Sequence, residues 1–160
     1  MNKLRQPSEV TLRDGRTLRE VLELHKMWLD NEEGGERADL SFEDLSWVDL
    51  EGANLKGTDL RGANLSYANL YGADLTNTKF YSTNLYKAKG DFVGVENIGS
   101  RGDTTHYFYK DNRVICGCFS GTMEEFKEKV KESYGEDDRE YKEYMATIRI
   151  LKELAELKME

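Results

Sequence analysis

A large apolar residue occupies every fifth position in the middle of the chain, and a small residue usually stands two places before it. An α-helix repeats its faces every 3.6 residues and a strand every two, so a period of five fits neither. The pattern predicts a chain that turns a corner after each five-residue unit and points its large and small apolar residues inward. The ten large inward positions are Leu40, Leu45, Leu50, Leu55, Leu60, Leu65, Leu70, Leu75, Phe80 and Leu85.

Polar residues follow the same period. Asp or Asn directly precedes nine of the ten large residues, where its oxygen can accept a hydrogen bond from a backbone N–H at the corner. Glycine stands two places after four of them, at Gly52, Gly57, Gly62 and Gly72, where a corner needs conformational freedom. Glu43 replaces a small inward residue, which predicts an imperfect first turn, and Lys79 replaces an Asp or Asn as the pattern fades.

This period resembles that of the pentapeptide-repeat family, whose pattern is A(D/N)LXX, over about residues 38–85. The resemblance implies a mainly β fold, a short right-handed quadrilateral β-helix with four units in each turn. Ten units would make two and a half turns, a coil only about 12 Å tall if stacked strands lie roughly 4.8 Å apart.

The segments that flank the repeats predict caps over the open ends of the coil. In "TLREVLELHKMWLDNEEGG" an apolar stripe that includes Leu18, Val21 and Leu29 predicts a helix, with His25 as a polar residue at the edge of the packed cap rather than a ligand. We therefore expect flanking α structure in three parts: an N-terminal helical cap over residues 1–35, repeats over 36–90 and a C-terminal module over 91–160.

The C-terminal module is predicted to contain a β-hairpin and two helices. Two strands flank a turn at residues 110–113, and a capping box formed by Thr122 and Glu125 begins a helix that ends at Gly135. A last helix is expected from Asp138 to Lys158. Its apolar stripe is too broad for one small neighbour to cover, which predicts a homo-oligomer with Tyr141, Tyr144 and Ile148 at the interface.

Composition narrows the function classes. The net charge is −8 and no segment is basic, which argues against direct binding of nucleic acid. There is no apolar run of membrane-spanning length and no apolar signal segment, so we expect a protein of a bacterial cytoplasm that contacts no membrane. Cys116 and Cys118 alternate along a predicted strand and are interpreted as buried structural thiols.

Catalytic chemistry has little support. The chain has no nucleophile elbow, P-loop or HExxH motif, and its two histidines lie in unrelated segments. We therefore expect no enzymatic activity, no cofactor and no metal site.

The stretch "GSRGDTTH" is the candidate ligand site. Its hydroxyls, free N–H groups and guanidinium suit a small anion, and the residues assigned to binding are Ser100, Arg101, Thr104, Thr105 and His106. The alternative is an ordinary lead-in to the hairpin whose arginine pairs with a nearby acid.

Aromatic residues at outward positions of the coil form a second candidate surface. A contact with a protein, a second subunit or a ligand would use them, unless the flanking helices fold back over them. These residues are Trp47, Tyr67, Tyr71, Tyr81 and Tyr86, with Phe42 beside them.

The flanking stretches "LELHKMWLDNEEGGERADL" and "IGSRGDTTHYFYKDNRVICGCFSGTMEEFKEKV" resemble segments of pentapeptide proteins carried by bacteriophages. This resemblance implies a phage protein that acts in the host cytoplasm. We expect it to blunt bacterial immune defence, and the favoured mechanism is sequestration of a small anionic nucleotide-type signal.

One alternative is an inhibitor of the anti-CRISPR, anti-restriction or gyrase type that binds a nucleic-acid-handling enzyme through the coil, and another is a structural adaptor. Mimicry of DNA by the coil is disfavoured by charge. Duplex DNA carries one charge per roughly 1.7 Å, so a coil of this height would need about seven outward negatives. Residues 36–90 carry six basic and eight acidic side chains, a net charge of −2.

Overall fold

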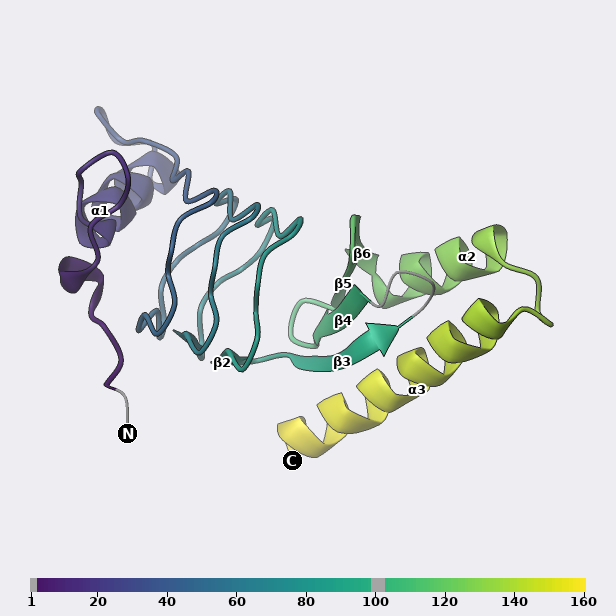
Figure 1. The fold of residues 1–160 in the computed structure, drawn as a ribbon. Helices are drawn as coiled ribbons and strands as arrows, with labels where there is room; N and C mark the ends of the chain where they lie inside the picture. The colour runs from purple at the N-terminus through teal and green to yellow at the C-terminus, as the bar shows by residue number, and fades with distance from the viewer. Residues whose placement is uncertain (1–2, 99–102) are drawn as a thin grey trace. The chain divides into compact units, whose positions relative to one another are not determined.

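The computed structural model describes residues 3–98 and 103–160 (Figure 1). The chain forms two compact units, and the boundary between them falls between Gly90 and Asp91. The first unit holds the N-terminal helix and the repeats, and the second holds a β-sheet and two helices.

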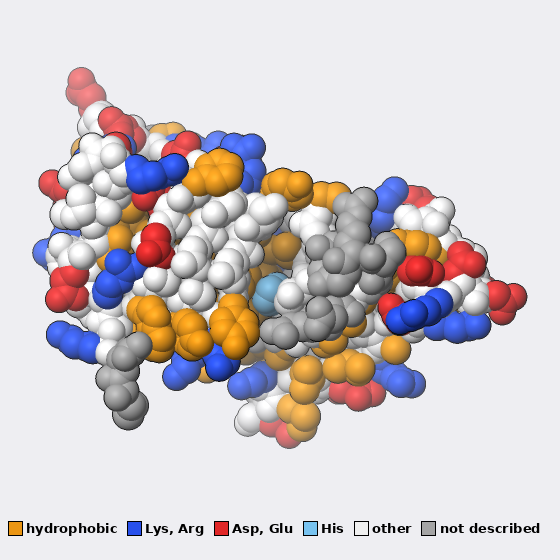
Figure 2. All heavy atoms as spheres, viewed as in Figure 1, with side chains coloured by type: hydrophobic (Ala, Val, Ile, Leu, Met, Phe, Trp, Pro, Cys, Tyr) orange, Lys and Arg blue, Asp and Glu red, His pale blue; other side chains and the backbone are white. Residues whose placement is uncertain are grey.

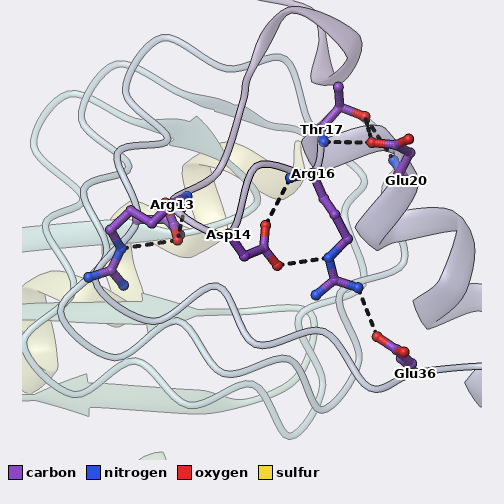
Figure 3. Close-up of polar contacts among 7 residues, drawn as sticks. Arg13, Asp14, Arg16, Thr17, Glu20 and Glu36 are labelled. Carbon is purple, nitrogen blue, oxygen red and sulfur yellow. Dashed lines mark hydrogen bonds and ion pairs between the residues drawn. The ribbon is translucent and has the colours of Figure 1, made fainter.

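The first unit opens with a 3-10 helix, η1 (Pro7–Glu9), and an α-helix, α1 (Leu18–Leu29). Thr17 and Glu20 form a reciprocal capping box at the start of α1 (Figure 3). The Thr17 hydroxyl accepts the Glu20 N–H at 3.3 Å, and the Glu20 carboxylate accepts the Thr17 N–H at 2.7 Å. Two of the donors that every helix N-terminus leaves unpaired are thereby satisfied.

The repeats wind as a stack of turns that are each twenty residues long (Figure 1). Parallel bridges join Asp39 to Asp59 and Asp59 to Lys79, and further bridges join other residues twenty positions apart. The short strands β1 (Asn69–Leu70) and β2 (Lys89–Gly90) pair in parallel with the same spacing. Each turn therefore contains four five-residue units.

The large residue of every unit fills the interior of the coil, as the sequence predicts. Leu40, Leu45, Leu55, Leu60 and Leu65 have no exposed surface, and the other five are at most 5% exposed. Burying a leucine side chain stabilises the fold by roughly 1.5–3 kcal/mol, so this column of side chains supplies the core of the first unit.

The polar residue before each leucine has the predicted local role. All nine Asp or Asn side chains accept a hydrogen bond from the N–H two residues later, as Asp39 does from Ser41 at 3.0 Å and Asn84 from Tyr86 at 3.0 Å. This Asx turn folds the chain toward the corner without help from another turn of the coil.

Every corner has a residue in the left-handed region, with φ between 52° and 72°. The four glycines predicted at corners are among them. Six residues with side chains adopt the same conformation, which the repeat pattern did not predict. The ten corner residues are Phe42, Trp47, Gly52, Gly57, Gly62, Tyr67, Gly72, Asn77, Ser82 and Lys87.

Both exceptions to the repeat pattern take part in ion pairs. Glu43 accepts the Arg13 guanidinium, with Nε and Oε1 3.1 Å apart, so the imperfect first turn is tied to the N-terminal segment. Lys79 Nζ lies 3.7 Å from Asp59 Oδ2 in the preceding turn. In the same N-terminal segment Arg16 bridges Asp14 and Glu36 (Figure 3).

The second unit contains a four-stranded antiparallel sheet in the order β3 (Val93–Ile98), β4 (Asp103–Phe108), β5 (Arg113–Cys116) and β6 (Phe119–Thr122). The prediction of a single hairpin is therefore wrong, because it covers only the two central strands. The strand β3 begins only three residues after the repeats end, so it is not set apart from them by a turn of its own. The short strand β6 contains Ser120 and Gly121, which have a weak preference for strands.

Helices α2 (Met123–Ser133) and α3 (Arg139–Met159) pack with this sheet, and the predicted capping box of Thr122 and Glu125 begins α2. Tyr144 and Ile148 are only 8% and 5% exposed in the core of the unit. Their assignment to a subunit interface is wrong, because that side of α3 already packs within its own unit. Tyr141 is partly buried against the same core.

The two cysteines occupy different environments. Cys116 is buried at the end of β5, whereas Cys118 is exposed in the two-residue turn that leads to β6. Gly117 begins this turn with a φ of 55°, a conformation that favours glycine at the first position of a tight hairpin. The prediction that both thiols are buried on one strand face is therefore wrong for Cys118.

Candidate functional site

The predicted anion site is only partly described. Ser100 and Arg101 lie outside the described residues, while Thr104, Thr105 and His106 are consecutive residues of β4. Side chains alternate across a strand, so Thr105 points to the opposite face from the other two. Thr105 is fully buried and its hydroxyl donates to Cys116 Sγ at 3.0 Å. It has no surface to offer a ligand, which corrects its assignment to the site.

His106 is half-buried beside an aromatic side chain. Its ring meets that of Phe92 edge to face, with centroids 5.7 Å apart. Burial lowers the pKa of His106 to about 4, so the imidazole is neutral near pH 7. A neutral imidazole can offer one donor and one acceptor but no charge to an anion.

The outward aromatic residues of the coil, unlike the predicted anion site, all lie within the described residues. Four of them are exposed: Phe42 at 67%, Tyr81 at 56%, Tyr86 at 49% and Tyr71 at 43%. Trp47 and Tyr67 are half-buried because their rings cover one another. The helices of the first unit therefore leave these aromatic side chains accessible.

Three residues and one cation form an aromatic column along a corner of the coil. The rings of Trp47 and Tyr67 are stacked, with centroids 4.3 Å apart and planes 2° apart, and Tyr86 meets Tyr67 edge to face at 5.7 Å. Lys87 Nζ lies 5.6 Å from the Tyr67 centroid and 5.2 Å from that of Tyr86. We call Trp47, Tyr67, Tyr86 and Lys87 the aromatic column.

The column carries a backbone cost. Trp47 and Tyr67 have φ values of 60° and 61°, and left-handed backbone costs a residue with a side chain roughly 1–2 kcal/mol. Stacking of the two rings returns about 0.5–1.5 kcal/mol. Glycine occupies four other corners without this cost. Local stability alone therefore does not account for the aromatic residues at these two corners. Strained backbone positions concentrate at functional sites.

A second aromatic group borders the same side of the coil. The Phe42 ring lies against Gly62 in the next turn, so closely that a Cβ at Gly62 would come within 2.5 Å of it. We call the side between the Phe42 and Trp47 corners the tyrosine side; it comprises the outward side chains of residues 43–47, 63–67 and 83–87. Figure 2 shows a polar side of the coil bordered by hydrophobic side chains along both edges.

The middle of the tyrosine side is a hydrogen-bonded ladder of short polar side chains. Asn84 Nδ2 donates to Asn64 Oδ1 at 3.1 Å, and Asn64 Nδ2 donates to Asp44 Oδ1 at 3.1 Å. Hydrogen bonds from Ser46 and Asn64 and the nearby Arg5 charge lower the pKa of Asp44 against the opposing effect of burial. The ladder fixes its members in place, so this side is a rigid surface.

His25 connects α1 to the first turns of the coil and is fully buried. Its Nδ1 accepts the Ala38 N–H at 3.1 Å, so the ring proton of the neutral form sits on Nε2, which lies 3.1 Å from the Lys56 carbonyl oxygen. Thr58 Oγ1 is also 3.2 Å from Nε2. The residue is a structural link, in agreement with its interpretation as part of the cap.

Neither a metal-binding cluster nor a membrane-spanning helix is found in the part of the chain that the structure describes. Across residues 3–98 and 103–160, no three His, Cys, Asp or Glu side chains gather in a way that could hold a metal ion. Within the same residues, no helix has both the length and the apolar character needed to cross a membrane.

Comparison with known proteins agrees with the period of the coil. Residues 44–80 match the pentapeptide-repeat family in eight copies. The crystal structure of a pentapeptide repeat protein (Rfr23) from the cyanobacterium Cyanothece 51142 is 43% identical over 33% of this chain and 36% of that one, with a TM-score of 0.33. The match thus spans about a third of that protein, and no match was found among curated proteins. At residues 44–80 this chain is thus similar to pentapeptide repeats.

Proposed function

We propose that the protein is a non-enzymatic binding protein whose repeats form a right-handed quadrilateral β-helix and present their aromatic residues to a bacterial protein. The observation that carries this proposal is the aromatic column. Aromatic side chains and arginine dominate the energetics of protein interfaces, and a rigid arrangement loses little side-chain entropy on binding. The amide ladder beside the column is compatible with the polar contacts found around such anchors.

The biological setting that we propose is a bacteriophage protein that acts in the host cytoplasm against bacterial defence. It rests on the resemblance of both flanking segments to phage proteins. A nucleic-acid-handling enzyme of the CRISPR, restriction or gyrase type would be the target. Contact through aromatic side chains suits the coil better than imitation of DNA, because residues 36–90 carry a net charge of only −2.

Sequestration of a nucleotide-type signal by the second unit is the second candidate. It is favoured by Thr104 and His106, which lie on one face of β4 with the Phe92 ring beside His106, where a nucleobase could stack. Calorimetry with cyclic dinucleotides and ADP-ribose derivatives tests it. Binding that is lost in Arg101→Ala and Thr104→Val would support it, and absence of heat with every compound would reject it.

We also propose that the protein self-associates through α3. Ile150, Leu154 and Leu157 recur at helical spacing and are 39%, 38% and 68% exposed. Light scattering after size-exclusion chromatography should give a multiple of the 18.5 kDa chain mass, and Leu157→Glu should lower it to the monomer. A monomeric wild type would overturn this assignment.

The main proposal is tested by affinity purification from a bacterial lysate with two variants. Tyr67→Gly removes a ring from the aromatic column and suits the left-handed corner, and Tyr71→Ala removes an exposed ring elsewhere on the coil. A partner identified by mass spectrometry should then bind as a purified protein, lose activity on binding, and bind Tyr67→Gly much more weakly. Equal binding of wild type and both variants would remove the coil from the mechanism.

A further inference from the structure

We infer that the tyrosine side of the coil binds a carboxylate-rich segment of a protein partner. This inference rests on the proposed function and adds the binding side and the chemistry of what it binds. It is carried by what the aromatic column leaves exposed and by how the ion pairs around it are oriented.

The stacked faces of Trp47 and Tyr67 are occupied within the protein, whereas Tyr86 is 49% exposed. Trp47 and Tyr67 cover each other, the rings of Tyr67 and Tyr86 meet edge to face, and the Lys87 ammonium lies over both tyrosine rings. The groups left for a partner are ring edges, phenol hydroxyls and an ammonium. Ring edges carry partial positive charge, and the other two groups are hydrogen-bond donors, so the column is complementary to acceptors.

Two ion pairs on and beside the tyrosine side expose their cation more than their carboxylate, although Asp44 on this side is itself exposed. Of the Arg13–Glu43 pair, the arginine side chain is 64% exposed and the glutamate only 11%, so the outer surface presents the cation. Across the Phe42 corner, Arg61 is 51% exposed over Asp59, which is 10% exposed. In both pairs the carboxylate lies beneath the cation.

The tyrosine side therefore differs from the coil as a whole. With Arg5 and Arg13, which contact its first turn, it has three basic residues, the third being Lys87, against the acidic Glu43 and Asp44. Residues 36–90 taken together carry a net charge of −2. The net charge of the whole segment does not describe the tyrosine side, because the charged residues are distributed unevenly around the axis of the coil.

Other anionic or polar ligands fit less well. A single-stranded nucleic acid binds mainly by stacking its bases on successive aromatic faces, and in the column the facing surfaces of Trp47 and Tyr67 already stack on one another. Duplex nucleic acid needs a larger cluster of cations than this side carries. A protein segment rich in Asp or Glu needs neither, since its carboxylates can accept from ring edges, phenols and exposed guanidinium groups.

Fluorescence titration of the full chain tests the inference. In a Trp28→Phe background Trp47 becomes the single tryptophan, so its emission reports from the column itself. The probes are poly-L-glutamate, a Glu–Tyr copolymer and a twenty-residue oligothymidylate. We expect saturable binding of the two carboxylate polymers, weakened by salt, and at least tenfold weaker binding by Lys87→Glu and by Tyr67→Gly.

The matched control is Tyr71→Ala, which should bind like the parent. The inference is overturned if neither carboxylate polymer binds, if Lys87→Glu binds them unchanged, or if the oligothymidylate binds more tightly. If the carboxylate polymers do not bind but the purified host partner still requires Tyr67, the proposed function is supported and only this inference is rejected. The partner would then be recognised by other chemistry. If the polymers do not bind and partner binding does not depend on Tyr67, both the inference and the proposed function are rejected.

Discussion

His25 connects α1 to the coil through hydrogen bonds to two backbone groups, the Ala38 N–H and the Lys56 carbonyl. Its imidazole, which has no exposed surface, satisfies both groups. A buried backbone group left unpaired costs about 1–3 kcal/mol. His25 therefore stabilises the fold through its hydrogen bonds, without carrying a charge.

We therefore predict that His25→Phe, which keeps an aromatic ring but neither nitrogen, lowers the free energy of unfolding by about 2–4 kcal/mol. Urea denaturation followed by tryptophan fluorescence measures the change. Trp28→Phe is the matched control, since Trp28 stacks on His25 but is 41% exposed, and it should cost far less. A loss below 1 kcal/mol for His25→Phe would contradict the assigned hydrogen bonds.

Both histidines also predict how stability depends on pH. Burial lowers the pKa of His25, and it lowers that of His106 from 6.5 to about 4. The unfolded chain therefore takes up protons near pH 6.5 before the folded chain does. The free energy of unfolding should be steady above that pH and fall as the pH drops toward 4, with His106 contributing at most about 3 kcal/mol.

Denaturation curves between pH 4.5 and 8 check this, because the carboxylates stay ionised over most of that range. His106→Asn should flatten the decline, while His25→Phe should flatten it and lower the whole curve. A stability that rises on acidification would show that the histidines are more easily protonated in the folded state than in the unfolded one.

Individual residues differ in how far their roles could be predicted. Leu60 and Gly57 were predicted correctly because each depends only on its place within one five-residue unit. The stacking of Trp47 on Tyr67 was not, since it depends on which residues lie side by side in successive turns. The twenty-residue spacing between them was the available signal, and it could have been applied to the outward positions as well.

At the scale of the repeat unit, the Asx turn is the device that bends each side, and Lys79 is the one position of ten that lacks a side-chain oxygen to form it. Its ammonium instead approaches Asp59 at 3.7 Å, with the lysine half-exposed. An ion pair of that kind contributes little.

Lys79→Asn should therefore stabilise the first unit by about 0.5–1 kcal/mol, because a new amide oxygen would accept the N–H of Tyr81. Thermal denaturation of the full chain measures it. The converse change, Asn84→Lys, removes an existing Asx bond and should destabilise by a similar amount. If both substitutions shift the midpoint in the same direction, the Asx turn does not account for the pattern.

The strands of the second unit show where a pattern of local residues is insufficient. β4 and β5 flank a turn with clear turn chemistry and were predicted as a hairpin. β3 and β6 gain their stability from pairing with those neighbours, as Val95 does opposite Thr105 and Ser120 opposite Ile115. A strand whose own residues have weak preference is visible only once its partner is placed.

At the scale of the whole chain, each unit has a core of its own. The repeats enclose the leucine column, and the sheet with α2 and α3 encloses a separate cluster around Val114, Phe126 and Leu151. Both tryptophans lie in the first unit, whereas α2 and α3 make up most of the helix and lie in the second.

The two units should thus unfold at different denaturant concentrations. Tryptophan fluorescence would follow the first and helical circular dichroism mainly the second, so the two transition curves are expected not to coincide. Leu60→Ala should move the fluorescence curve and leave most of the circular dichroism curve in place, at a cost of about 2–5 kcal/mol to the first unit. Superimposable curves in the wild type would mean that the cores are coupled.

The twenty-residue turn restricts how a gene for such a coil can change in length. An insertion or deletion of five codons keeps every leucine inside the coil. It also shifts all later residues by one of the four sides, so that Lys87 would no longer lie next to Tyr67 in the following turn. Only steps of twenty codons lengthen the stack and keep its columns in line. Ancestral growth by whole turns would preserve whatever the columns bind, while growth by single units would create new surfaces from old sequence.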